Sequence, residues 1–226
     1  MRSPLIYAYT IVSLSSDGLR IAIAAPRGAD MAGRDTVHQF VDNEWKQLGS
    51  DILGERFKSR TTFTRISADG STLVLGAPLD DAIGTGSSSG SLRIFRFDEK
   101  ELDWAQVGRS FYGDAGSFLG VYPHVSEDGK TIAFSGLGWS RVYNYHPDED
   151  EWKQVGKDFE SMICMDLSPD GTRALMCSVV LSVSLNHCHI YQFDDTTKDW
   201  NKTSSFVDPG KCGMVTCAQT ATLLTC

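Results

Sequence analysis

The sequence predicts an all-β protein, a β-propeller of four-stranded antiparallel blades with four recognisable repeats. Three observations support this prediction. A segment made of an aliphatic residue, Ser, a variable residue and Asp-Gly occurs four times, around Asp17, Asp69, Asp128 and Asp170. The same three landmarks follow each copy in the same order. The runs between landmarks are short, rich in β-branched and aromatic residues and bounded by turn residues, which is typical of strands.

The landmarks divide each repeat into strands. The first is an apolar run that ends in small residues, as in "RIAIAAP" and "TLVLGAP". The second pairs an aliphatic residue with aromatic or polar neighbours, as in "VHQF", "IFRF", "VYNY" and "IYQF". The third is an acidic turn before Trp45, Trp104, Trp152 or Trp200, which opens a last strand such as "WKQLG". One strand before Asp-Gly and three after it make a four-stranded unit, and a repeat of roughly 40–50 residues is typical of a propeller blade.

The repeats place the blades at about 9–55, 61–112, 121–160 and 162–206, followed by an irregular tail at 207–226. The first strand lies close to the N-terminus, so two architectures stay open: a small closed ring, or part of a larger one. An incomplete ring would expose apolar blade faces, which favour association.

Composition excludes some classes of partner. The formal net charge is -8 and no cluster of Lys and Arg occurs, which argues against a nucleic-acid partner. No apolar run approaches the roughly 20 residues that span a bilayer, so no transmembrane segment is expected. The first residues are only weakly similar to a signal peptide. All six cysteines lie in the C-terminal third without paired C-x-x-C spacing, so the redox compartment and the localisation stay open.

The order of S-x-D-G, a strand ending in "GAP", and aromatic and "WxQxG" strands resembles FG-GAP repeat proteins, which form integrin-α-like β-propellers. "AAP" at Ala24–Pro26 and "GAP" at Gly76–Pro78 carry the resemblance best, and it covers roughly residues 9–206. It adjoins the broader kelch and galactose-oxidase-like propellers. The resemblance implies an adhesion-like interaction module, secreted or at the cell surface, in a family where calcium-binding blades occur.

The Asp-Gly segments themselves are predicted to be hairpin turns rather than metal sites. Each offers one carboxylate, with Glu127 added in the third copy, whereas Ca²⁺ takes about 6–8 oxygen ligands. We therefore expect no metal and no cofactor there. The structural turn residues are Asp17, Gly18, Asp69, Gly70, Asp128, Gly129, Asp170 and Gly171.

The register across these turns follows from the apolar pattern. Turn chemistry alone fits a three-residue loop with a left-handed Gly. A loop with an even number of residues instead sets Leu14 opposite Ile21, and it gives an aliphatic pair in all four copies. In the even register Cys164 lies directly opposite Cys177, and we expect a disulfide between them if the compartment is oxidising.

Loops at one rim of the blades are the predicted binding face, because loops on a rigid scaffold carry most binding functions. They follow Pro26 and Pro78 and contain the candidate binding residues Arg27, Asp30, Arg34, Asp35, Asp80 and Asp81. Such loops contact a cation or a basic partner in some proteins and are only solvated in others. "NHCHI" at 186–190 is interpreted as a strand entry rather than a metal site, and Asn201 begins a sequon that matters only in a secreted protein.

The predicted function is a non-enzymatic module that binds a protein or a glycan. One alternative is a propeller enzyme acting on glycans or sugar-like substrates, and another is an intracellular scaffold. An enzyme needs convergent polar groups at the ring axis, where we expect small and apolar residues. No G-x-S-x-G, H-E-x-x-H or phosphate-binding glycine loop is present, and the acidic clusters lie in turns.

Overall fold

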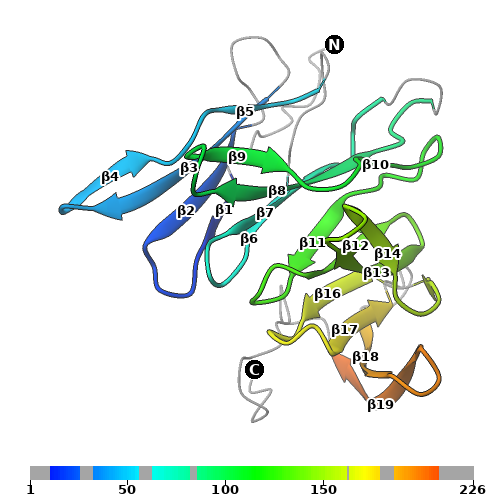
Figure 1. Ribbon diagram of the computed structural model, residues 1–226. Coiled ribbons are helices and arrows are strands. Elements are labelled where there is room, and N and C mark those ends of the chain that lie inside the picture. The colour runs from blue at the N-terminus through cyan, green and yellow to red at the C-terminus, as the bar shows by residue number, and fades with distance from the viewer. Residues whose placement is uncertain are drawn as a thin grey trace.

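The computed structural model describes residues 11–25, 33–55, 63–81, 86–161, 163–178 and 186–208. Over these residues the protein is all β, with four antiparallel sheets and no helix, which confirms the predicted fold class. Each sheet is one blade, and the blades follow one another in chain order (Figure 1). The strand that precedes each Asp-Gly lies at the centre, since β1, β6, β11 and β16 are neighbours in that order.

Each blade contains one strand before its Asp-Gly turn and three or four after it. Blade 1 comprises β1 (Ile11–Leu14), β2 (Arg20–Ala25), β3 (Arg34–Val41), β4 (Glu44–Gln47) and β5 (Ile52–Leu53). Blade 2 comprises β6 (Phe63–Ile66), β7 (Thr72–Ala77), β8 (Ser91–Asp98), β9 (Asp103–Gln106) and β10 (Phe111–Tyr112). Blade 3 comprises β11 (Val121–Val125), β12 (Thr131–Gly136), β13 (Trp139–His146), β14 (Glu151–Gln154) and β15 (Phe159–Glu160). Blade 4 comprises β16 (Ile163–Leu167), β17 (Arg173–Ser178), β18 (Asn186–Asp194) and β19 (Asp199–Asp208).

The repeated Ser-x-Asp-Gly forms the same hydrogen-bonded turn in every blade. In blade 1, Ser15 Oγ accepts the backbone N–H of Arg20 at 2.9 Å and donates to Asp17 Oδ1 at 2.6 Å. Asp17 Oδ1 also accepts the backbone N–H of Leu19 at 2.9 Å, and the N–H of Gly18 donates to the Ser15 carbonyl. The pKa of Asp17 is lowered first by the bond from the Ser15 hydroxyl and then by the bond from the Leu19 N–H.

The other three turns contain the same bonds, centred on Ser67 and Asp69, Ser126 and Asp128, and Ser168 and Asp170. Gly18, Gly70, Gly129 and Gly171 all have a φ between 68° and 72°, in the left-handed region that favours glycine. The repeated residues therefore build a turn whose polar groups are bonded to one another.

The even register is the one observed. Leu14 pairs with Ile21, Ile66 with Leu73, Val125 with Ile132 and Leu167 with Ala174. In every blade the Ser hydroxyl replaces one of the two backbone bonds that would otherwise close the hairpin. Apolar matching across the turn therefore predicted the pairing better than turn type did.

The predicted neighbourhood of Cys164 and Cys177 is wrong. An irregularity in β16 between Cys164 and Asp166 shifts the register, so Cys164 pairs with Met176 and Ile163 pairs with Cys177. An extra residue in one strand shifts the pairing of every residue beyond it by one position. Cys177 is instead disulfide-bonded to Cys188, its directly paired residue on β18, with their Cα atoms 4.0 Å apart.

The core lies between the blades. At the first junction, Ala22 and Val37 of blade 1 pack with Leu73, Phe97 and Trp104 of blade 2. The second junction is built around Val74, Ile94, Ile132, Phe134 and Trp152, and the third around Ala133, Val142, Ala174, Met176 and Trp200. Each blade therefore depends on its neighbours to bury its two faces.

Of the predicted tail, residues 207 and 208 belong to β19, and residues 209–226 lie outside the described residues.

Candidate interaction surface

In blades 2, 3 and 4 the tryptophan near the start of the fourth strand joins its blade to the preceding one. The indole Nε1–H of Trp104 donates to the Leu48 carbonyl at 2.9 Å. Trp152 donates to the Val107 carbonyl at 3.0 Å and Trp200 to the Val155 carbonyl at 2.8 Å. All three side chains are buried, with 6–8% of their surface exposed.

A left-handed glycine follows each of these carbonyls and lies under the indole. Gly49, Gly108 and Gly156 have φ values of 75°, 69° and 71°. A Cβ atom on them would lie 2.7, 2.7 and 2.5 Å from Cδ1 of the tryptophan of the next blade. We call the carbonyl residue and its glycine a tryptophan seat: Leu48–Gly49, Val107–Gly108 and Val155–Gly156. The "WxQxG" spacing thus has two physical reasons, backbone conformation and close approach.

The acidic turn before each tryptophan adds a second contact across the junction. Asp103 Oδ1 accepts the backbone N–H of Ser50 at 2.7 Å, and this bond is the main cause of the lowered pKa of Asp103. Asp150 Oδ1 accepts the N–H of Gly108 at 2.9 Å, and Asp199 Oδ1 accepts the N–H of Lys157 at 3.1 Å. These carboxylates hold neighbouring blades together.

Trp45 occupies the same position in blade 1, but no blade of the described residues covers it. Its side chain is 47% exposed, and its indole N–H has no partner among the described residues. Its ring packs against Phe40 of its own blade, with centroids 5.3 Å apart. Where the structure describes residues 11–208, no tryptophan seat lies against Trp45.

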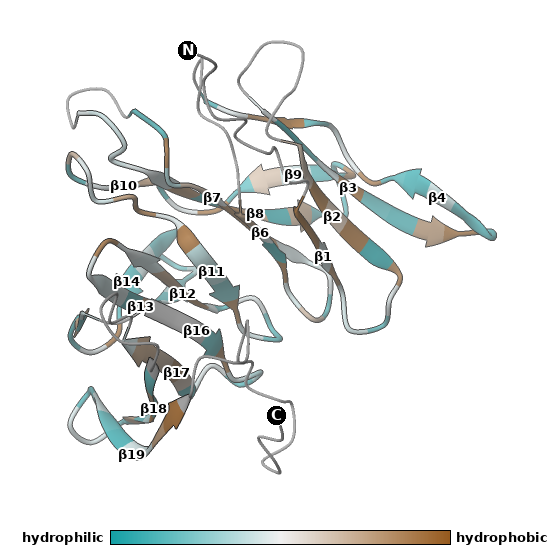
Figure 2. Cartoon of the chain, turned by 180° about the vertical axis from the view of Figure 1, so that it is seen from behind, coloured by the Kyte–Doolittle hydropathy of each residue, from teal (hydrophilic) through white to brown (hydrophobic). Residues whose placement is uncertain are grey.

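The surface around Trp45 is mostly apolar, with a few polar side chains. Strand pairing places the following side chains on this side of the sheet: Val12, Leu14, Ile21, Ile23, Ala25, Arg34, Thr36, His38, Phe40, Trp45, Gln47 and Leu53. We call them the open face of blade 1. Val12 and Leu14 are 55% and 54% exposed, whereas Ile66, which corresponds to Leu14 in blade 2, is 5% exposed. Figure 2 shows the apolar character of β1 and β2. The exposed large hydrophobic side chains of this face are Val12, Leu14, Phe40, Trp45 and Leu53.

His38 adds a polar group to the open face. Its Nδ1 is buried and has no hydrogen-bond partner among the described residues. The corresponding residues in the other blades are the aromatic side chains Phe95, Tyr143 and Tyr191.

The predicted rim residues are separated by the structure. Arg27 and Asp30 lie outside the described residues. Arg34 Nη1 lies 3.1 Å from Asp51 Oδ2 within blade 1, and Asp35 is buried.

In the second rim loop, Asp80 is buried. Its carbonyl accepts the N–H of Gly90 at 3.0 Å and the hydroxyl of Ser89 at 3.1 Å. Asp81 Oδ1 accepts the N–H of Ser88 at 2.7 Å. These contacts organise the loop itself, and the binding role of the rim stays a prediction.

A row of polar side chains lies on the central strands, where sequence reasoning expected small and apolar residues. Ser13, Arg65, His124 and Asp166 occupy one position of the repeat, just before its aliphatic residue. Ser13 Oγ accepts the N–H of Ile66 at 3.1 Å, and His124 Nδ1 lies 3.2 Å from Asp166 Oδ1. Burial lowers the pKa of His124 although the Asp166 bond opposes this, so the imidazole is neutral at pH 7. In the sequence, the only signal of this polar row is that one repeat position carries Ser, Arg, His and Asp in turn.

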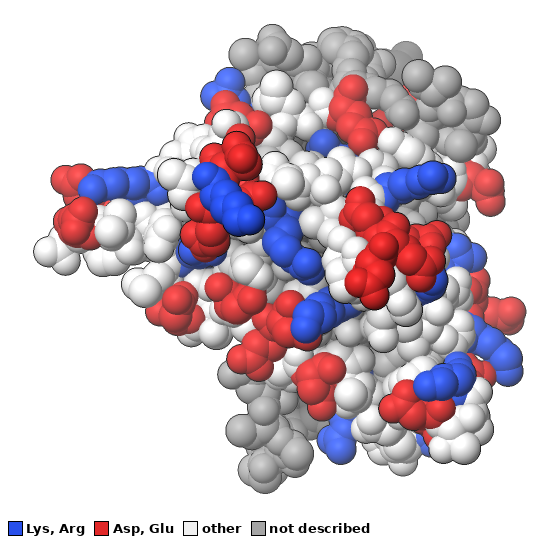
Figure 3. Space-filling model, in the orientation of Figure 1, with Lys and Arg blue, Asp and Glu red and all other residues white. Residues whose placement is uncertain are grey.

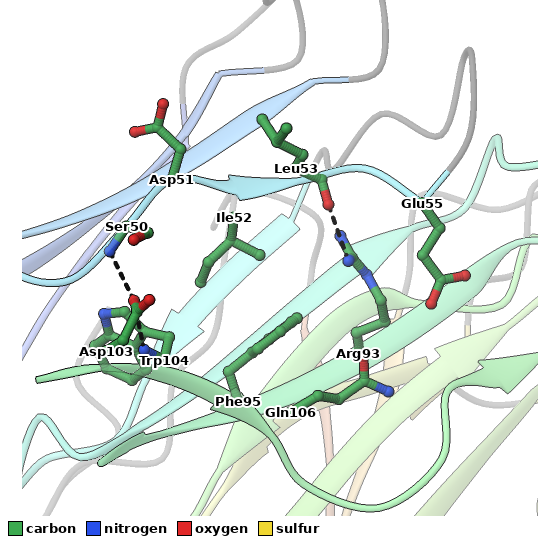
Figure 4. Close-up of a pocket in the computed structure, with 10 residues that line it drawn as sticks. All are labelled: Ser50, Asp51, Ile52, Leu53, Glu55, Arg93, Phe95, Asp103, Trp104 and Gln106. Atoms are coloured by element: carbon green, nitrogen blue, oxygen red, sulfur yellow. Dashed lines mark hydrogen bonds between the residues drawn. The ribbon is translucent and has the colours of Figure 1, made fainter. Parts of the chain in front are cut away.

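One pocket of about 240 Å³ lies at the junction of blades 1 and 2 (Figure 4). At one end the buried Arg93 donates from Nη1 to the Leu53 carbonyl at 3.0 Å, and at the other Asp103 accepts the N–H of Ser50. Glu55, beside Arg93, accepts bonds from Ser110 Oγ at 2.8 Å and from the Tyr112 hydroxyl. The polar groups of the pocket thus tie the two blades together.

No three His, Cys, Asp or Glu side chains of the described ranges gather as metal ligands. His189 Nδ1 lies 2.9 Å from Ser205 Oγ, and Asn201, exposed on β19, donates to Asp194 Oδ2 at 3.1 Å. Where the structure describes the chain, no helix is long and apolar enough to cross a membrane. Basic and acidic side chains are interspersed on the face in Figure 3, without a continuous basic patch.

No family model and no curated protein matches this sequence. Solved structures do match. A candidate 6-phosphogluconolactonase from Bacteroides uniformis, a β-propeller-like fold, superposes with a TM-score of 0.60 at 18% identity over 91% of this chain. KlAtg21, solved with the coiled-coil of AgAtg16, gives 0.61 at 14% identity over 87% of this chain. A functionally unknown protein from Desulfotomaculum acetoxidans gives 0.51 at 12% identity over 91%.

These likenesses show the fold, a β-propeller. The chain spans 58% and 57% of the length of the first and second of these structures, and 72% of the third.

Proposed function

We propose that this protein is a non-enzymatic interaction module that binds a protein partner through the open face of blade 1. The observation that carries the proposal is Trp45, which is 47% exposed where its three counterparts are 6–8% exposed. A large aromatic side chain with an apolar surround and one N–H donor is the composition of an interface anchor. The apolar character of the face favours a protein over a glycan, and the FG-GAP-like repeat supports an adhesion-type role. KlAtg21 provides a precedent, since a protein of similar fold was solved with a coiled-coil.

A second candidate is an enzyme acting on sugar-like substrates. The polar row on the central strands favours it, together with the likeness to the candidate 6-phosphogluconolactonase. In that function the neutral imidazole of His124, held by Asp166, would act as a base, and Arg65 would bind an anionic group of the substrate. His124 is only 5% exposed, which gives a substrate little access and makes this candidate second.

A photocrosslinker at Leu14, on the open face, tests the proposed function. It is expected to capture a partner that the same group at Leu102, an exposed side chain in the acidic turn of blade 2, does not capture. The purified partner should then bind Trp45→Asp at least tenfold more weakly than the unchanged protein, because truncating a central aromatic anchor costs about 2 kcal/mol or more. Affinity is measured by calorimetry.

The matched control is Leu102→Asp, which places the same charge on an exposed leucine of blade 2 and should change the affinity less than twofold. A partner that binds Trp45→Asp as tightly as it binds the unchanged protein would contradict the proposed function. Binding that is lost in His124→Gln but kept in Trp45→Asp would favour the enzyme candidate instead.

A further inference from the structure

We infer that the partner of the open face is another blade of this repeat, one whose fourth strand ends in an aliphatic residue followed by a left-handed glycine. The inference rests on the proposed function and names the partner. Three junctions in the same molecule define what a face of this kind binds, and all three use the same contacts. The open face of blade 1 would form a fourth junction of the same kind.

The side chains of the open face match those that meet a seat elsewhere. In blade 2, Ile66, Leu73 and Leu75 face blade 1, where Ala22 and Val37 receive them. In blade 4, Ala174 and Met176 face Ala133 and Val142 of blade 3.

Leu14, Ile21 and Ile23 stand at the corresponding positions of blade 1. The partner's surface is therefore small and aliphatic, with a seat at its outer end. The seat has a free carbonyl for Trp45 Nε1 and no Cβ under the indole.

Blade 4 of a second copy of the chain does not offer a tryptophan seat. Four residues after Trp200, where the other blades have the seat glycine, stands Ser204, and its φ is not positive. Ser204 pairs with Ile190 within the continuous strand β19, whereas the other blades break their fourth strand at this glycine. The apolar residues on the far side of blade 4, Leu175, Cys177 and Cys188, are already buried.

Two open faces packed against each other would not satisfy Trp45 either. Each face carries an indole donor, and neither side of the contact offers a seat carbonyl. A buried donor without an acceptor costs about 1–3 kcal/mol. The occupant is thus a blade from outside the described residues. It is neither blade 4 nor the open face of a second copy of this chain.

A fusion of one extra blade to the full chain tests this assignment. A copy of residues 119–161, which carries the Val155–Gly156 seat, is joined through a flexible Gly/Ser linker in front of the full chain. Such a linker holds the copy at an effective concentration of the order of mM. The copy should dock on the open face, and hydrogen exchange of the Trp45 indole N–H, followed by NMR and assigned with Trp45→Phe, should slow at least tenfold. The melting temperature should rise with it.

The matched control is the same fusion with Gly156→Val in the added copy alone. In the existing junction a Cβ on Gly156 would lie 2.5 Å from Cδ1 of Trp200. The same clash is expected with Trp45, so this fusion should exchange at Trp45 as fast as the unfused chain. Equal slowing in both fusions would overturn the inference and leave the open face as a general apolar docking surface, with the proposed function intact. Slowing in neither fusion would also overturn it, while the Trp45→Asp affinity measurement reports separately on the proposed function.

Discussion

Replacing Trp152 with alanine is expected to lower the free energy of unfolding by about 3–5 kcal/mol, as for other buried aromatic side chains. The indole is 6% exposed and packs in the core between blades 2 and 3. Its removal also leaves the Val107 carbonyl without the donor that now lies 3.0 Å away, which adds to the loss. Urea denaturation followed by circular dichroism gives the value.

Trp45→Ala is the matched control, because Trp45 holds the same position in the repeat. It is half exposed and contacts Phe40 of its own blade, so its loss should cost less than about 1 kcal/mol. Equal destabilisation by the two substitutions would contradict the distinction between a filled and an unfilled junction.

Gly129→Ala is expected to destabilise the protein by about 2–5 kcal/mol. An alanine in the left-handed region costs about 1–2 kcal/mol by itself. A Cβ on Gly129 would also lie 2.1 Å from Thr72 Oγ1 and 2.6 Å from Thr72 Cβ, on the neighbouring blade. Thr72 is fully buried and has little room to move, so overpacking adds about 1–3 kcal/mol.

Gly18→Ala separates these two costs. Gly18 has a φ of 72° against 68° at Gly129, and it forms the same turn. A Cβ there would meet nothing within 4 Å, so only the conformational cost applies. If the two variants unfold at the same urea concentration, the turn of blade 3 does not contact blade 2 as described.

Much of the fold could be predicted from the sequence because each repeat carries its own local signals. Ser, Asp and Gly bond within one turn, so four copies of that turn are visible without any long-range information. Apolar matching across the turn sets the pairing, as Leu14 and Ile21 show. The disulfide was predicted wrongly because the irregularity in β16 shifts the register between Cys164 and Asp166 without changing the apolar pattern.

The candidate surface depends on contacts between blades, and these have no local signal. Gly49 lies under Trp104 from a position 55 residues earlier in the chain, and the pattern "WxQxG" alone does not show which blade fills which seat. The exposure of Trp45 is likewise invisible in the sequence, because its local sequence "EWKQ" is identical to that around the buried Trp152. Burial at this position is decided by the neighbouring blade.

Three tryptophans fill seats and Trp45 does not, and hydrogen exchange of the four indole N–H groups in the unfused protein measures this difference. Slow exchange is expected at Trp104, Trp152 and Trp200, each bonded to a carbonyl of the preceding blade at 2.8–3.0 Å. Exchange at Trp45 should be close to that of a free indole. Protection of Trp45 equal to that of the other three, or fast exchange at all four, would contradict this difference.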